Sequence, residues 1–192
     1  MIAIIKYPAG NITSVENAVN RLGYQCVVTD DVELLKSADK VIFPGVGEAS
    51  TAMKYLKEKG LDKLIPALMQ PVLGICLGQQ LMCNFSEEND TECLGIFNTT
   101  VKKFPPIELV PHMGWNNIEV LRSNLLEGIS ADENFYFVHS FYAEPSESTT
   151  ATCNYILPFS AVMEKDNFYA TQFHPEKSAD AGEKILQNFL GF

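Results

Sequence analysis

The sequence predicts an α/β fold: an open, mostly parallel, twisted sheet with helices on both faces and antiparallel strands added in the second half. In the first half, short apolar runs alternate with stretches of helical periodicity, a pattern typical of parallel sheets built from right-handed crossovers. In the second half, aromatic and β-branched residues replace this alternation, which indicates antiparallel strands. No linker, repeat or low-complexity segment interrupts the 192 residues, so we expect one domain over 1–192.

In the first half, four apolar runs are the expected strands: Ile2–Ile5, Gln25–Val28, Val41–Phe43 and Val72–Ile75. The expected helices are at 13–22, 32–37, 50–59 and 77–85. Gly23 and Gly60 stand where the end of a helix favours a left-handed residue. Open sheets of this kind bind ligands beyond the carboxyl ends of their strands, so the segments after the third and fourth strands are expected to share a cleft.

In the second half, strands are expected over Phe135–Tyr142, Thr149–Tyr155 and Ala161–Ala170, the last containing a hairpin turn at Glu164–Asn167. A closing helix is expected over about residues 179–190, because apolar residues there recur at helical spacing.

Cys76 stands on a sharp strand-to-helix turn, between Gly74 and Gly78. The spacing Gly-x-Cys-x-Gly matches a nucleophile elbow, where glycines relieve crowding at a strained bend. At a helix N-terminus the thiolate is favoured over the thiol, and the Leu77 N–H is placed to stabilise an oxyanion. On this motif alone, a small buried hydrophobe is an equally good interpretation of the cysteine.

A base for this thiol is available in the segment Phe173-His174-Pro175-Glu176. Pro175 favours an extended conformation for His174, and residues two apart in an extended segment share a face, so Glu176 is expected beside the imidazole. The carboxylate holds one ring nitrogen and leaves the other for the thiol. Taken alone, this tripeptide is better read as a surface turn; together with the elbow it favours a catalytic triad.

The motifs at 74–80 and 173–176 resemble those of the class I, or triad, glutamine amidotransferases. Further segments resemble the glutaminase subunits of imidazole glycerol phosphate synthase: 9–11, 43–47, 111–116, 139–141 and 177–178. Among them, Pro-His-Met-Gly-Trp-Asn at 111–116 is the most discriminating, and the matches extend over nearly the whole chain.

The resemblance implies a reaction in which Cys76, His174 and Glu176 hydrolyse glutamine to glutamate and ammonia through a cysteinyl thioester. The oxyanion donors would be the Leu77 amide and an amide of the loop formed by Gly45, Val46 and Gly47. The resemblance also implies the residues that bind glutamine, namely Gln80, Glu88, Ser140 and Phe141. His139 is a weaker candidate for a second base, because a histidine in an aromatic strand is more often structural.

The chain has two arginines and no glycine-rich phosphate cradle, so the ammonia acceptor is expected to bind to another protein. By resemblance this partner is a (β/α)₈-barrel cyclase subunit in a 1:1 heterodimer, which receives ammonia directly and makes imidazole glycerol phosphate and an aminoimidazole carboxamide ribonucleotide. The implied interface residues are Asn11, Met113, Trp115, Asn116 and Lys177. Trp115, the only tryptophan, is the expected anchor.

The composition excludes several other classes of protein. The net charge of −10 argues against a nucleic-acid partner, and no apolar run is long enough to cross a membrane. Five cysteines without a Cys-x-x-Cys pair are expected to be reduced thiols of a cytoplasmic protein, with no metal site and no cofactor.

Two alternatives remain at this stage. One is a glutaminase subunit of another ammonia-using synthase, such as those of pyridoxal phosphate or anthranilate synthesis, although residues 44–47 and 111–116 speak against it. The other is a catalytically silent protein that uses the fold to regulate a partner, which the intact Cys76, His174 and Glu176 make the weaker alternative.

Overall fold

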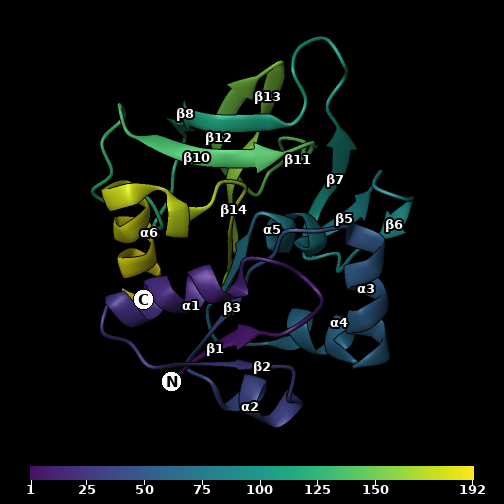
Figure 1. Cartoon of the computed structure of the whole chain (residues 1–192), viewed down its shortest axis with the longest axis vertical. Helices are drawn as coiled ribbons and strands as arrows, with labels where there is room; N and C mark the ends of the chain where they lie inside the picture. The colour runs from purple at the N-terminus through teal and green to yellow at the C-terminus, as the bar shows by residue number, and fades with distance from the viewer.

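The computed structural model describes all 192 residues and contains an eight-stranded main sheet with helices on both faces (Figure 1). The strands stand in the order β2 (Cys26–Thr29), β1 (Ile2–Ile5), β3 (Lys40–Phe43), β4 (Val72–Ile75), β14 (Phe168–Thr171), β13 (Leu157–Lys165), β12 (Thr149–Tyr155) and β9 (Glu119–Val120). The first five strands pair in parallel and the last three add antiparallel pairs, as the sequence predicts.

Helices cover both faces of this sheet because the parallel strands are apolar on both sides. In β1, Ile2 and Ile4 belong to one core cluster of 27 residues, and Ala3 and Ile5 belong to a second cluster of 26. The first cluster includes residues of α1 (Ile12–Arg21) and α6 (Ala179–Gly191). The second includes residues of α2 (Val32–Ser37), α3 (Ala49–Glu58), α4 (Leu61–Leu64), the 3₁₀ turn Ile65–Ala67 and α5 (Leu77–Met82).

Two smaller sheets complete the fold. One has the order β11 (Phe141–Ala143), β7 (Phe97–Lys103), β5 (Cys83–Ser86) and β6 (Thr91–Glu92). The other is an antiparallel pair of β8 (His112–Asn117) and β10 (Asn134–His139), which lies near β12 and β13 (Figure 1). No helix is long and apolar enough to span a bilayer.

The expected elements of the first half are confirmed closely, including the two left-handed glycines, Gly23 (φ +83°) and Gly60 (φ +70°). The helix expected over 77–85 is wrong beyond Met82. Its last residues form β5, because Phe85 pairs with Thr100 of β7, and this tertiary pairing overrides the local helical pattern. The single strand expected over Phe135–Tyr142 is broken at Ser140, where the chain leaves β8 and joins β7.

Candidate active site

Cys76 occupies a strained turn between β4 and α5, with φ +53° and ψ −105°. The flanking glycines have a steric reason for their positions. A Cβ at Gly78 would lie 1.8 Å from the carbonyl oxygen of Phe43, and one at Gly74 would lie 2.9 Å from the sulfur of Met82. The strain at Cys76 is therefore held by close packing of backbone, as expected of a functional turn.

The pairing of β4 with β14 brings the histidine segment to this turn. Residues Phe168–Thr171 run parallel to Val72–Ile75, and the N–H of Cys76 donates to the carbonyl of Thr171 at 2.8 Å. The chain that continues from β14 reaches His174 three residues later, in an extended conformation. Cys76 and His174 therefore follow the carboxyl ends of adjacent strands.

His174 and Glu176 form a fully buried pair. Nδ1 of His174 lies 2.7 Å from Oε1 of Glu176, and His174 Nε2 is buried with no hydrogen-bond partner. The expectation of an extended segment through Glu176 is wrong, because Pro175–Lys177 forms a 3₁₀ turn (η2); the carboxylate is nevertheless beside the ring. The Asn11 amide also donates to Glu176, a contact that sequence reasoning missed.

Charge determines the protonation of His174. Burial lowers the pKa of this ring, but the Cys76 thiolate and the Glu176 carboxylate outweigh burial and raise the pKa from 6.5 to about 10. The arrangement can therefore hold His174 as an imidazolium at neutral pH.

We expect the pKa of His174 to fall well below 10 in Cys76→Ala, because burial remains while the negative charge of the thiolate is removed. Imidazole ¹⁵N shifts followed against pH measure this directly. His139 serves as the internal control, since its pKa of about 3 is set first by burial and not by Cys76. A wild-type His174 that titrates near 6.5 would contradict the assignment.

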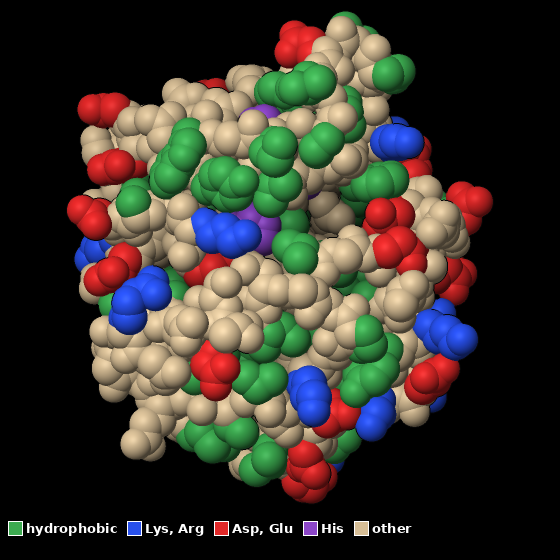
Figure 2. All heavy atoms as spheres, viewed as in Figure 1, with side chains coloured by type: hydrophobic (Ala, Val, Ile, Leu, Met, Phe, Trp, Pro, Cys, Tyr) green, Lys and Arg blue, Asp and Glu red, His purple; other side chains and the backbone are tan.

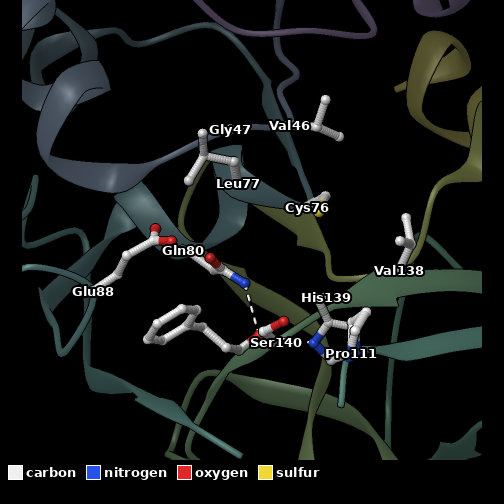
Figure 3. Close-up of a pocket in the computed structure, with 11 residues that line it drawn as sticks. Val46, Gly47, Cys76, Leu77, Gln80, Glu88, Pro111, Val138, His139 and Ser140 are labelled. Atoms are coloured by element: carbon white, nitrogen blue, oxygen red, sulfur yellow. Dashed lines mark hydrogen bonds between the residues drawn. The ribbon is translucent and has the colours of Figure 1, made fainter. Parts of the chain in front are cut away.

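A cavity of about 290 Å³ opens beside Cys76 (Figure 3). It brings together all four residues expected to bind glutamine: Gln80, Glu88, Ser140 and Phe141. The Glu88 carboxylate accepts from the Ala49 N–H at 2.8 Å, and burial raises its pKa. Val46, Gly47 and Leu77 line the same cavity, so the segments after β3 and β4 share one cleft as predicted.

A buried glutamine that sequence reasoning missed contacts the nucleophile. Gln172 Nε2 lies 3.6 Å from Cys76 Sγ, and Gln172 Oε1 accepts from Gln80 Nε2 at 2.9 Å. Gln172 precedes His174 by two residues. In an extended segment this spacing places both side chains on one face, and that was the sequence signal available for Gln172.

Hydrogen bonds to other backbone and side-chain groups hold the loop that was expected to supply the second oxyanion donor. The Leu77 N–H donates to the carbonyl of Gly45 at 3.1 Å. Both backbone groups of Val46 pair with Gly10, and the Tyr7 hydroxyl donates to the carbonyl of Pro44 at 2.6 Å. The N–H groups of Leu77 and Val46 are thus both bonded to backbone carbonyls, so their role as oxyanion donors stays a prediction that requires these bonds to break.

The five residues expected at a partner interface separate into two groups. Met113 and Trp115 are 64% and 55% exposed, and Lys177 is also exposed on the same side, near the ring of Tyr136 that Trp115 contacts. Asn11 and Asn116 instead direct their amides inward, to Glu176 and to His112.

Residues 4–191 match the glutamine amidotransferase class I family. The chain belongs to this family. The amidotransferase is 62% identical over 192 residues to the imidazole glycerol phosphate synthase subunit HisH of Bacteroides fragilis (strain YCH46), with 98% of each chain covered. It is 47% identical to the HisH subunit of Pasteurella multocida, with 98% of this chain and 96% of that one covered.

Solved structures show that the amidotransferase shares the fold. A crystal structure of a glutamine amidotransferase superimposes with a TM-score of 0.78 at 19% identity, covering 100% of this chain and 98% of that one. A structure of PurLQS from Thermotoga maritima gives 0.69 at 15% identity, with 99% and 97% covered. The amidotransferase contains no group of three or more His, Cys, Asp or Glu side chains placed to hold a metal ion.

Proposed function

We propose that residues 1–192 form one glutaminase domain, the glutamine-hydrolysing subunit of an imidazole glycerol phosphate synthase in histidine biosynthesis. The observation that carries the proposal is the strained Cys76 beside the buried His174–Glu176 pair, at the edge of a cavity lined by Gln80 and Glu88. The 62% identity to a HisH subunit supports the choice of this synthase over other ammonia-using enzymes.

In the proposed reaction, the Cys76 thiolate attacks the carboxamide carbon of glutamine and the carbonyl oxygen becomes an oxyanion. The His174 imidazolium gives its proton to the departing nitrogen, so ammonia leaves and a γ-glutamyl thioester remains. His174 then takes a proton from water, the hydroxide attacks the thioester, and glutamate leaves with the thiolate restored. Glu176 holds the ring through Nδ1 and stabilises its protonated form.

The cavity has groups of suitable charge for the amino-acid end of glutamine. Glu88 offers a carboxylate to the α-ammonium group, with Gln80 beside it, and the backbone at Ser140 and Phe141 is available to the α-carboxylate. In Figure 3 Glu88 and Gln80 lie on one side of the cavity and Cys76 on another, so a bound glutamine can extend between them.

The oxyanion hole must form for the rate to be high. We infer that the loop Gly45–Gly47 reorients to free the Leu77 N–H and to add a second donor, because that amide is bonded to Gly45 in this structure. One missing donor typically lowers the rate by about 10² to 10³-fold. A partner or ligand that reorients this loop would therefore control the rate of glutamine hydrolysis.

The residues proposed for the partner surface lie next to the cavity. Met113 and Trp115 extend from β8, and Val138, which pairs with Met113, lines the cavity. In Figure 2, apolar side chains form a band over the part of the molecule where Figure 1 places β8 and β10. We propose that a (β/α)₈-barrel cyclase subunit docks here in a 1:1 complex and receives ammonia directly.

Glutamate release from glutamine tests the proposal, measured with the chain alone and with the cyclase subunit and its phosphorylated ligand. We expect a low rate alone and a rise of at least about 10² to 10³-fold in the complex, the size of one oxyanion donor, because the reorientation supplies two. A rate that the cyclase leaves unchanged would assign the chain to another acceptor enzyme. No glutamate under any condition would favour the silent regulatory protein.

A further inference from the structure

Two buried histidines outside the Cys76–His174–Glu176 group are hydrogen-bonded to each other. His112 of β8 and His139 of β10 are 4% and 6% exposed, and His112 Nδ1 lies 3.1 Å from His139 Nε2. Burial lowers the pKa of His112 to about 4 and that of His139 to about 3, so both rings are neutral near pH 7. Each ring then carries one N–H donor and one acceptor nitrogen.

The neighbouring atoms determine which nitrogen carries each proton. His139 Nδ1 lies 2.7 Å from the carbonyl oxygen of Phe141, which can only accept, so Nδ1 is the donor and Nε2 the acceptor. His112 Nδ1 must then donate to His139. His112 Nε2 is left as an acceptor, and the Asn116 amide nitrogen lies 3.3 Å from it. All four ring nitrogens are satisfied with donation in one direction, from Asn116 towards Phe141.

The outer end of this chain of hydrogen bonds is held on the inner face of β8, the strand whose outer face carries the proposed partner surface. The Asn116 amide has only one possible orientation, because its Oδ1 accepts from the Asn117 N–H at 2.9 Å and its Nδ2 donates to the carbonyl of Asn154 at 3.1 Å. Asn116 and His112 lie on the inner face of β8, opposite the exposed Met113 and Trp115. A displacement of β8 therefore moves the first donor of the chain.

The inner end is in the glutamine cavity. The carbonyl of Phe141 that accepts from His139 also accepts from Gln80 Nε2 at 2.9 Å. Gln80 bonds to Gln172, whose amide nitrogen lies 3.6 Å from Cys76 Sγ. One continuous set of hydrogen bonds thus joins the inner face of β8 to the nucleophile.

Aromatic packing prevents the two rings from reorienting independently. The His112 ring is stacked between two aromatic rings. Its centroid lies 4.9 Å from that of Phe137, with 26° between the ring planes, and 4.1 Å from that of Tyr155, with 16° between the planes. His139 contacts Phe159 at 5.0 Å. The rings therefore transmit a displacement and do not absorb it.

We propose that His112 and His139 are positioning residues that couple strand β8 to the Phe141 carbonyl and the Gln80 side chain, so that a partner bound over Met113 and Trp115 orders the glutamine cavity. This coupling deepens the proposed function and rests on it. His139 is not a second base in this arrangement, because its Nδ1–H is bonded to Phe141 and its Nε2 to His112.

Imidazole ¹⁵N NMR of the whole chain tests the coupling without activity. We expect both rings as neutral Nδ1–H tautomers at pH 7, and a shift of the His139 signals when the cyclase subunit binds. His112→Phe keeps the stacked ring and removes its hydrogen bonds, so the His139 shift on binding should disappear. An Nε2–H tautomer for either ring, or an unchanged His139 shift in His112→Phe, would overturn the proposal.

Glutamine kinetics give the second readout. We expect the cyclase to lower the KM for glutamine in the wild type. In His112→Phe the factor by which the cyclase lowers this KM should be about tenfold smaller, which is the size of one buried hydrogen bond. His112→Asn offers an amide near the position of Nδ1 and should recover part of it. Tyr155→Phe is the matched control, because it keeps the stack and loses only a hydroxyl bonded to Leu109 outside the chain of hydrogen bonds.

The two proposals fail in different ways. A wild type that releases no glutamate would refute the proposed function, and the NMR experiment would still decide whether the hydrogen bonds couple β8 to Phe141. An active wild type whose response to the cyclase is unchanged in His112→Phe would refute the coupling alone.

Discussion

Cys76→Ala is expected to lower glutamate release in the cyclase complex by about 10⁵-fold or more, which corresponds to about 7 kcal/mol of activation free energy. Without the thiolate there is no thioester, and water must attack the carboxamide directly. The rest of the site stays in place, because alanine keeps the Cβ that the turn already accommodates. Single-turnover release of glutamate measures the loss.

The matched control is Cys153→Ala. Cys153 is also a buried free thiol, and burial raises its pKa to about 12, so it remains protonated. Its replacement should leave the glutaminase rate close to that of the wild type and lower only the free energy of unfolding. Equal losses in both variants would show that folding, and not nucleophilic attack, accounts for the effect.

The strained backbone at Cys76 lowers the free energy of unfolding, and this cost can be measured separately from activity. Cys76 has a positive φ that residues with a Cβ adopt at a cost of about 1–3 kcal/mol. Cys76→Gly should therefore have a free energy of unfolding about 1 kcal/mol above that of Cys76→Ala, while both are inactive. Urea unfolding of the two variants gives the difference. No difference would show that the turn holds no strain.

The local parts of the fold were predictable, because they depend on residues close in the sequence. The four strands of the first half and the closing helix follow from apolar runs and helical spacing. Gly78 marks the elbow through its spacing from Cys76, although its close approach to the Phe43 carbonyl, which is why it must be glycine, is not a local contact. The failure at residues 83–85 has the opposite cause, since Phe85 is held by Thr100 of another strand.

The candidate site was predictable as a set of residues and not as an arrangement. Cys76 and His174 are adjacent because β14 returns beside β4, nearly a hundred residues later in the chain, and no local pattern specifies that pairing. The contact of Gln172 depends on the same long-range pairing, and the contact of Asn11 depends on the packing of α1 against η2. The bond from Leu77 to Gly45 depends on a peptide orientation that glycine permits in more than one form.

Gly78→Ala is expected to lower the free energy of unfolding by about 3 kcal/mol or more. The added Cβ would lie 1.8 Å from the carbonyl oxygen and 2.9 Å from the carbonyl carbon of Phe43. Both contacts are with backbone, so α5 must move away from the end of β3. Because α5 begins directly after Cys76 and carries Leu77 and Gln80, the glutaminase rate should also fall, by about 10²-fold for a displacement of about 1 Å.

Gly191→Ala separates this steric effect from ordinary helix propensity. Both glycines lie in helices, where alanine is favoured by up to about 1 kcal/mol in the interior and by less at a last residue such as Gly191, but a Cβ at Gly191 meets no atom within 4 Å. The two substitutions should therefore change the free energy of unfolding in opposite directions. Thermal and urea unfolding, with the glutaminase rate in the complex, measure both. A Gly78→Ala protein as stable and active as the wild type would show that the elbow does not need this contact between α5 and β3.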